Sequence, residues 1–143
     1  MNVIKFVTFP DAPAPPNYAS EGAAGADLSS AEDHEILSQD WAPIRTGYGI
    51  ELPEGYEAQI RPRSGLALKH GITVLNAPGT IDSDYRGEIG VVLINHSGVP
   101  FQVTRGMRIA QLVISKVEKA VFVKVDSLDV TARGSGGYGS TGT

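Results

Sequence analysis

The chain has 143 residues, with 12 basic and 16 acidic side chains, three histidines and no cysteine. This length fits one domain, the lack of cysteine excludes disulfides and thiolate nucleophiles, and a formal charge of −4 argues against sequence-independent binding of nucleic acid. No apolar run approaches the roughly 20 residues of a membrane span. The first ten residues lack the features of a secretory signal, so we expect a cytoplasmic protein without a membrane-bound segment.

Short segments of alternating apolar and polar residues predict strands along most of the chain. In chain order they are residues 3–7, 48–52, 55–61, 88–95, 99–103, 108–117 and 121–125. Most of the 17 glycines and nine prolines fall between these segments, as turn residues do. The pattern predicts a single all-β domain over residues 1–132 and leaves a sandwich, a jelly roll and a barrel open as architectures.

One short helix is predicted from Ser64 to His70. Ser64 is a candidate N-cap, and Gly71 can end the helix. Because Arg63 directly precedes the helix, a guanidinium group and free backbone N–H groups would meet there and form a candidate anion site. An ordinary capped surface helix explains the spacing equally well.

Two segments look irregular. Residues 11–21 form a loop in a proline-rich part of the chain, and residues 133–143 form an extended, glycine-rich C-terminal arm. The arm fits a flexible terminus. Because it carries Arg133 and Tyr138, it also fits a mobile lid that orders over a phosphorylated ligand, with the arginine on a phosphate and the aromatic ring on a base.

Several polar residues stand out as candidate site residues. Asp82 and Asp84 would share one face of an extended segment, either as part of an acidic turn or with one carboxylate aimed at a reacting water and Tyr85 as a wall. Asp27 is either a turn residue or a metal ligand. Gln111 lies in an otherwise apolar strand, where solvent exposure on one face is an equal explanation. The chain has no Gly-x-Ser-x-Gly segment, which disfavours a serine hydrolase.

Five stretches of the sequence, taken in order, resemble the five motifs of the trimeric dUTP pyrophosphatases (dUTPases). They are residues 24–28 (AGADL), 62–65 (PRSG), 79–87 (GTIDSDYRG), 108–112 (RIAQL) and 133–142 (RGSGGYGSTG). Each motif alone is weak, but their joint order and spacing over nearly the whole chain are specific.

The resemblance implies a distorted, jelly-roll-like β-barrel assembled as a homotrimer with shared active sites. It implies hydrolysis of dUTP to dUMP and pyrophosphate with Mg²⁺, by attack of water on the α-phosphorus. This reaction would lower dUTP and supply dUMP for thymidylate synthesis. The arm formed by residues 133–143 would close over the active site of a neighbouring subunit.

The third motif, by resemblance, supplies the catalytic group and the nucleoside contacts. Asp82 would be the general base that deprotonates the attacking water. Asn76 and the backbone around Thr80 and Ile81 would read the uracil edge. Tyr85 would pack against the deoxyribose and leave no space for a 2′-hydroxyl group.

The remaining motifs would bind the phosphates, the metal and the base. Residues expected to contact the phosphates are Arg63, Ser64, Gly65, Arg133, Gly139 and Ser140. Gln111 would help to bind either the phosphates or a water on the metal. Tyr138 would stack on uracil, although the family more often has phenylalanine at this position. Asp27 would contact Mg²⁺ through water, because Mg²⁺ keeps several waters and takes other ligands from substrate phosphates.

Two alternatives from other functional classes remain at the level of the sequence. The first is a dUTP-binding regulator without turnover, and the second is a structural jelly-roll subunit. The regulator predicts binding without pyrophosphate release. The structural protein predicts no nucleotide affinity.

Overall fold

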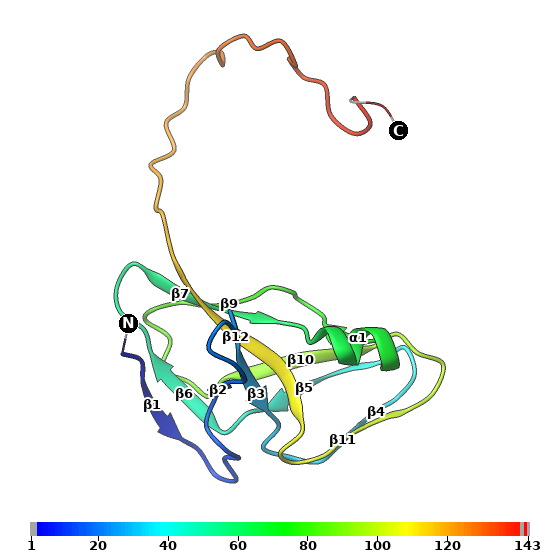
Figure 1. Cartoon of the computed structure of the whole chain (residues 1–143). Coiled ribbons are helices and arrows are strands. Elements are labelled where there is room, and N and C mark those ends of the chain that lie inside the picture. The colour runs from blue at the N-terminus through cyan, green and yellow to red at the C-terminus, as the bar shows by residue number, and fades with distance from the viewer. Residues whose placement is uncertain (1–2, 141, 143) are drawn as a thin grey trace.

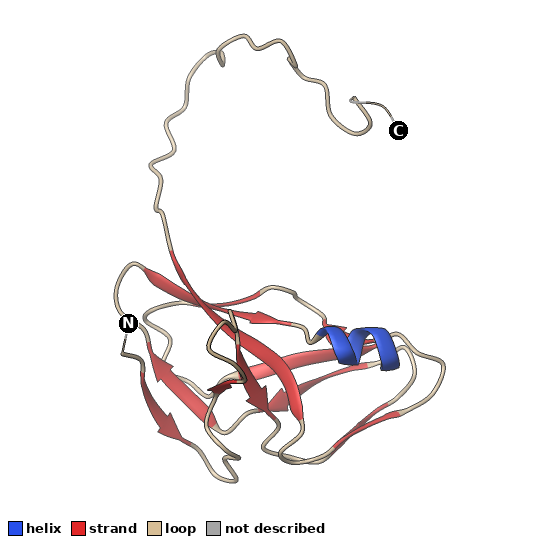
Figure 2. Ribbon diagram, viewed as in Figure 1, coloured by secondary structure: helices blue, strands red, loops and turns tan. Residues whose placement is uncertain are grey.

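The structure is a computed structural model that describes residues 3–140 and 142. Residues 1, 2, 141 and 143, which belong to the ends of the expected domain and arm, lie outside the described residues. Residues 3–117 form a body that consists mainly of strands, which we call the β body, and one helix lies at its edge (Figures 1 and 2). The elements are β1 (Lys5–Thr8), β2 (Asn17–Tyr18), β3 (Ala26–Ser29), β4 (His34–Ile36), β5 (Trp41–Arg45), β6 (Tyr48–Glu51), β7 (Tyr56–Arg61), α1 (Ser64–His70), β8 (Ile72–Val74), β9 (Gly79–Ile81), β10 (Gly90–Asn95), β11 (Phe101–Val103) and β12 (Arg108–Lys116).

The described strands pair in an antiparallel manner and form four sheets. The largest has the strand order β2-β3-β12-β7-β9, and a three-stranded sheet has the order β5-β10-β8. β1 pairs with β6, and β11 pairs with β4. The all-β expectation is confirmed, while the expected closure into a barrel is not observed among the described residues.

Side chains from the two larger sheets meet in one hydrophobic core. Val91 and Leu93 of β10 are fully buried there, together with Leu28 of β3 and Ile60 of β7. Because alternate residues of a strand point to opposite faces, the second face of the five-stranded sheet is left for polar side chains. Gln111, for example, is half-buried on that face, between two core-facing neighbours.

The structure contains six of the seven predicted strands, with ends that differ by up to two residues. The predicted strand 121–125 is wrong, because these residues are extended without a strand partner in this chain. Six short strands were not predicted: β2, β3, β4, β5, β8 and β9. Pro43 lies within β5, which is tolerated because β5 is an edge strand.

The helix has its predicted bounds but a different N-cap residue. Its N-cap residue is Arg63, in an extended conformation and without a side-chain cap hydrogen bond, so Ser64 is the first helical residue and not the cap. Gly71 ends the helix in the left-handed conformation with a φ of 64°, as glycine allows. Leu66 packs against the core, while the rest of the helix surface remains exposed.

Two local expectations about loops also change. The segment 11–21 is irregular except for β2, where Asn17 and Tyr18 pair with β3. Asp84 does not extend β9, because the Tyr85 N–H donates to the Asp82 carbonyl at 3.1 Å and closes a turn. Asp82 and Asp84 therefore do not share the face of one strand.

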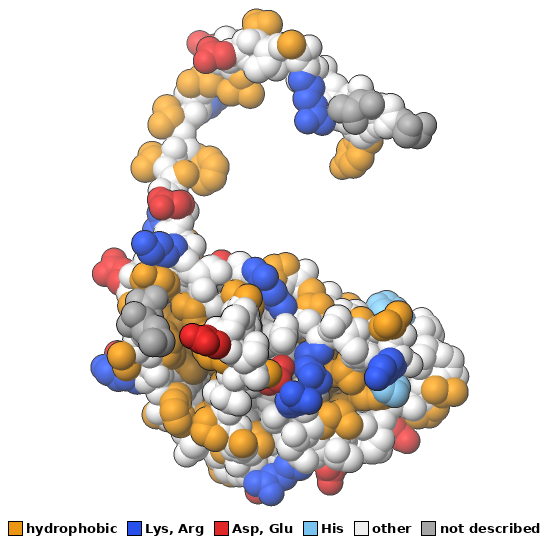
Figure 3. Space-filling model, in the orientation of Figure 1, with side chains coloured by type: hydrophobic (Ala, Val, Ile, Leu, Met, Phe, Trp, Pro, Cys, Tyr) orange, Lys and Arg blue, Asp and Glu red, His pale blue; other side chains and the backbone are white. Residues whose placement is uncertain are grey.

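The C-terminal segment leaves the β body after Val117, whose N–H donates a hydrogen bond to the Gly55 carbonyl at 2.9 Å. Residues 118–140 run away from the sheets and are exposed (Figures 1 and 3). Phe122 is 96% exposed, and Val121 and Val123 are almost as open. Within the described residues, no helix combines the length and apolar character that crossing a membrane requires.

We expect Leu93→Ala to lower the free energy of unfolding by about 2–5 kcal/mol, because it removes a fully buried side chain and leaves a cavity. Leu68→Ala is the matched control. Leu68 is 87% exposed on α1, so we expect a change within about 0.5 kcal/mol. Urea unfolding measures both values, and equal effects would contradict the assigned core.

Candidate active site

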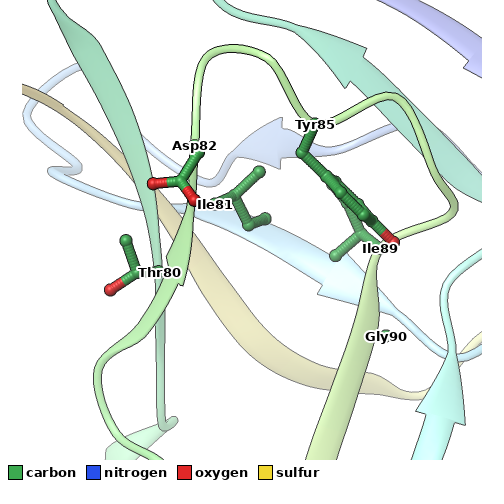
Figure 4. A pocket seen from close by; sticks show the side chains of 6 residues that line it. All are labelled: Thr80, Ile81, Asp82, Tyr85, Ile89 and Gly90. Atoms are coloured by element: carbon green, nitrogen blue, oxygen red, sulfur yellow. The ribbon is translucent and has the colours of Figure 1, made fainter.

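Asp82 directly follows β9, and this places its carboxylate beside a cavity. Figure 4 shows Thr80 and Asp82 directing their oxygen atoms to the same side of β9, while Ile81 points to the other side. This alternation follows from strand geometry and from the burial of Ile81 in the core. The cavity has a volume of ≈ 220 Å³ and is lined by Thr80, Ile81, Asp82, Tyr85, Ile89 and Gly90.

Tyr85 forms the wall of this cavity opposite β9. Its hydroxyl group donates to the carbonyl of Glu88 at 2.9 Å, which fixes the far end of the ring. A Cβ atom on Gly87 would overlap the Tyr85 hydroxyl and ring, so this position requires glycine for the ring to lie there. The wall is therefore built by the loop that connects β9 to β10.

The edge of β9 is open for backbone recognition. Among the described residues, β9 is the last strand of the five-stranded sheet and pairs with β7 alone, with Thr80 opposite Gln59. Alternate residues of an edge strand direct their N–H and C=O groups away from the sheet, where a ligand can bind them. The side-chain amide of Asn76 lies near the start of this edge. Its Nδ2 atom is 3.3 Å from the position that a Cβ atom on Gly79 would occupy.

A second group of predicted residues lies on the polar face of the five-stranded sheet. Gln111 of β12 is directly opposite Asp27 of β3, so both side chains lie on one face. The Arg63 Nε lies 3.3 Å from Asp27 Oδ1, without hydrogen-bond geometry, and Arg108 Nη1 donates to Asp27 Oδ2 at 3.0 Å. Arg63 also donates to the Arg108 carbonyl at 3.1 Å.

This arginine cluster has a positive excess, because two guanidinium groups face one carboxylate. Asp27 is largely buried, while the Arg108 side chain is 55% exposed and open to a ligand. Ser64 and Gly65 follow Arg63 at the start of α1 and are exposed. In Figure 3, Lys and Arg side chains gather over the region of β12 and α1. The arrangement suits an anion such as a phosphate.

The third group lies on the arm, away from the other two. Arg133, Tyr138, Gly139 and Ser140 are all exposed. Arg133 Nε donates to the Gly136 carbonyl at 2.8 Å, and Gly139 has a φ of 76°. The predicted site residues thus form three separate groups within one chain.

The first two groups are too far apart for one small ligand. From β3 to β9 there are three strand spacings, and along β7 and β9 Asp82 lies about four residues from the Asp27–Gln111 row. At 4.8 Å per strand and 3.3 Å per residue, this separation is roughly 20 Å. A triphosphate whose α-phosphorus lies beside Asp82 cannot reach the arginine cluster of the same chain.

A family model for dUTPase matches residues 12–142, which is most of the chain. The chain belongs to the dUTPase family. The deoxyuridine 5′-triphosphate nucleotidohydrolase of Zymomonas mobilis is 57% identical over 127 residues, which cover 89% of this chain and 87% of the relative. The same enzyme of Thermobifida fusca is 58% identical over 134 residues, which cover 93% of this chain and 74% of the relative.

Solved dUTPase structures have the same fold. The dUTPase of Staphylococcus bacteriophage 80alpha with dUpNHpp is 25% identical, with a TM-score of 0.92 over 100% of both chains. A mutant dUTPase from phage phi11 of S. aureus, described with a structural Mg(II) ion, is 22% identical, with a TM-score of 0.83 over 90% of this chain and 100% of that one. These likenesses confirm the expected jelly-roll-like fold.

Arg108 is a candidate dUTPase site residue that sequence reasoning had not assigned a role. It belongs to the fourth motif, three residues before Gln111, and this proximity was the available signal. Its contact with Asp27 joins residues 81 positions apart, which the local pattern does not reveal.

Proposed function

We propose that this dUTPase hydrolyses dUTP to dUMP and pyrophosphate, which lowers dUTP and supplies dUMP for thymidylate synthesis. The observation that carries the proposal is a cavity that Asp82 and Tyr85 line together, beside the open edge of β9. The two relatives named as dUTP nucleotidohydrolases support it. The regulator and the structural subunit gain no support from these relatives.

The uracil base binds along β9. Its edge presents carbonyl oxygens and one N–H, which suit the backbone N–H and C=O groups that β9 leaves on its unpaired edge around Thr80 and Ile81. Asn76, whose amide lies near Gly79, supplies both a donor and an acceptor beside them. Backbone recognition of this kind fixes the orientation of the base.

The sugar lies against Tyr85. Because the hydroxyl group of Tyr85 is bound to Glu88, the ring is held as a fixed wall of the cavity. A fixed wall leaves no space for the 2′-hydroxyl group of a ribonucleotide, so the enzyme selects deoxyribose.

Asp82 acts as the general base. Its carboxylate takes a proton from a water molecule, and the water oxygen forms a bond to the α-phosphorus. The bond between that phosphorus and the oxygen that bridges to the β-phosphate breaks, which releases pyrophosphate and leaves dUMP. Asp82 is exposed beside a second hollow of ≈ 480 Å³, so water reaches it freely.

The phosphates are bound by a different copy of the chain. Gln111 lies roughly 16 Å and Asp27 roughly 20 Å from Asp82 of the same chain, and Arg63, which precedes Ser64 and Gly65, contacts Asp27. A complete site therefore requires two copies. This separation supports the homotrimer with shared sites that the sequence implies. Arg108, which is exposed at the arginine cluster, binds the phosphates together with these residues.

Mg²⁺ fits this site only as an ion carried by the substrate. Both oxygens of Asp27 face arginines, and the described residues contain no group of three His, Cys, Asp or Glu side chains that could hold a metal. Asp27 and Gln111 would therefore contact the ion through water. When bound, Mg²⁺ neutralises charge on the departing pyrophosphate.

The arm reaches the site of a neighbouring copy. Arg133 binds the terminal phosphate, Gly139 and Ser140 add donors, and Tyr138 stacks on the base. The open apolar residues before the arm, such as Val121 and Phe122, support contact with another copy, because a lone chain leaves them in water. The expected cytoplasmic location remains a prediction.

The function is tested by pyrophosphate release from dUTP with Mg²⁺, beside dTTP, dCTP and UTP. We expect dUTP to be hydrolysed at least about 10²-fold faster than the other three. The cavity leaves no space for a methyl or a 2′-hydroxyl group, and the groups that bind the uracil edge do not match the donors and acceptors of cytosine. Chelation of the metal is expected to lower the rate. Equal rates for UTP and dUTP would contradict the role of Tyr85.

We expect Asp82→Asn to lower kcat by about 10²–10⁴-fold while the Kd for dUTP changes little, because the amide keeps the shape but does not accept the proton. Asp84→Asn is the matched control. Asp84 lies two residues further, outside the Tyr85 cavity, and its replacement should change kcat only slightly. Unchanged turnover in Asp82→Asn would remove Asp82 as the base.

Deletion of residues 133–143 should lower kcat/KM by about 10²-fold, because the arm no longer positions the substrate. The described residues of the arm have no strand partner in the β body, so we expect the truncated chain to keep its oligomeric state. Analytical ultracentrifugation measures that state beside the rate assay. A monomeric truncated product would contradict a lid that only closes the site.

A further inference from the structure

The loop that carries Tyr85 ends at a rigid attachment to the turn between β5 and β6. Thr46 is fully buried, and it donates its N–H at 3.2 Å and its hydroxyl at 2.7 Å to the Ile89 carbonyl. The Ile89 N–H donates to the Tyr48 carbonyl at 2.7 Å. The residue that follows Glu88 is thus fixed on both of its backbone groups.

Glu88 reaches the same turn with its side chain. Its Oε1 accepts a hydrogen bond from the Gly47 N–H at 2.9 Å, and its Oε2 accepts one from Nε of Arg45 at 3.3 Å. Gly47 has a φ of 77°, and a Cβ atom there would lie 2.5 Å from the Cα of Ala12, so this position of the turn requires glycine. The carboxylate of Glu88 therefore binds two donors whose positions are set by the β body.

The backbone carbonyl of Glu88 also accepts a hydrogen bond from the Tyr85 hydroxyl group at 2.9 Å. The other hydrogen bonds of the loop are local, since Arg86 donates to the carbonyls of Ser83 and Tyr85. Within the part of the chain that the structure describes, only the carboxylate of Glu88 hydrogen-bonds residues 83–88 to a distant segment.

We infer that Glu88 is a positioning residue for sugar selection: its carboxylate holds the loop 83–88 against the β5–β6 turn, and its carbonyl fixes Tyr85. Glu88 does not line the cavity, so it acts on the substrate through Tyr85. The inference rests on the proposed function, because it assigns Glu88 to the selection that Tyr85 performs.

The expected size of the effect follows from the loop geometry. Without the carboxylate, residues 83–88 keep only their local hydrogen bonds, and the Tyr85 ring shifts with them. A displacement of about 1 Å in a positioning group can cost about 10²-fold in rate. The same displacement opens space beside the sugar, so discrimination against a 2′-hydroxyl group falls together with the rate.

The test compares Glu88→Ala and Glu88→Gln in the full-length chain. Measured quantities are the ratio of Kd values for UMP and dUMP, the ratio of kcat/KM values for dUTP and UTP, and amide hydrogen exchange. We expect Glu88→Ala to lower both ratios by about tenfold or more and to speed exchange in residues 83–88. Glu88→Gln keeps an oxygen for the Gly47 N–H, so it should recover most of both ratios.

Two controls separate positioning from loss of structure. Glu51→Ala removes another carboxylate in an ion pair, with Lys5 at 3.1 Å, and should leave both ratios unchanged. In a Tyr85→Ala background, Glu88→Ala should cause no further fall in either ratio, because no ring remains to be positioned. Faster exchange throughout the β body, or unchanged ratios in Glu88→Ala, would overturn the inference.

The binding ratio keeps this inference distinct from the proposed function. A wild-type chain that prefers dUMP to UMP but releases no pyrophosphate would refute the proposed function. The ratio of Kd values for UMP and dUMP in the Glu88 variants would still test the role of Glu88. A wild-type chain that binds both monophosphates equally would refute the selection itself, and with it the role of Glu88.

Discussion

The pairing of β9 with β7 on one edge alone is the constraint on which the active site depends. It fixes the alternation that buries Ile81 and turns Asp82 outward. Among the described residues it also leaves the other edge without a strand, so that backbone groups remain open to a ligand. A strand with neighbours on both sides would position the carboxylate equally well but would have no free backbone groups for the base recognition proposed above.

The same sheet is the reason for proposing that one copy has an incomplete site. Its polar face holds the arginine cluster at β3 and β12, and β9 lies at the far edge beyond β7. A rigid sheet keeps these groups apart, and no local adjustment brings Asp82 to Arg63. Symmetric assembly of copies is the simplest way to complete such a site, because every copy supplies the part that its neighbour lacks.

The sequence predicted the long strands well because their alternation is strong, as in β10 and β12. It did not predict β3 or β9, which are short and contain or follow glycine, nor β5, which contains Pro43. Alternation also predicted a strand at 121–125, but a local pattern does not reveal whether a partner strand belongs to the same chain. The motifs predicted roles for Asp82 and Tyr85, which line one cavity. The contacts of Glu88 with Gly47 and of Arg108 with Asp27 join distant positions that no local pattern connects.

The open segment around Val121 and Phe122 makes an isolated copy vulnerable. Extended, apolar and unpaired residues are a template for indiscriminate β pairing and an easy cleavage site for proteases. Correct assembly would remove this hazard by covering the segment. A newly synthesised chain would then have to associate with other copies before it aggregates or is cleaved by a protease. Survival of the protein in a cell would then depend on how fast chains are synthesised, as well as on how stably each one folds.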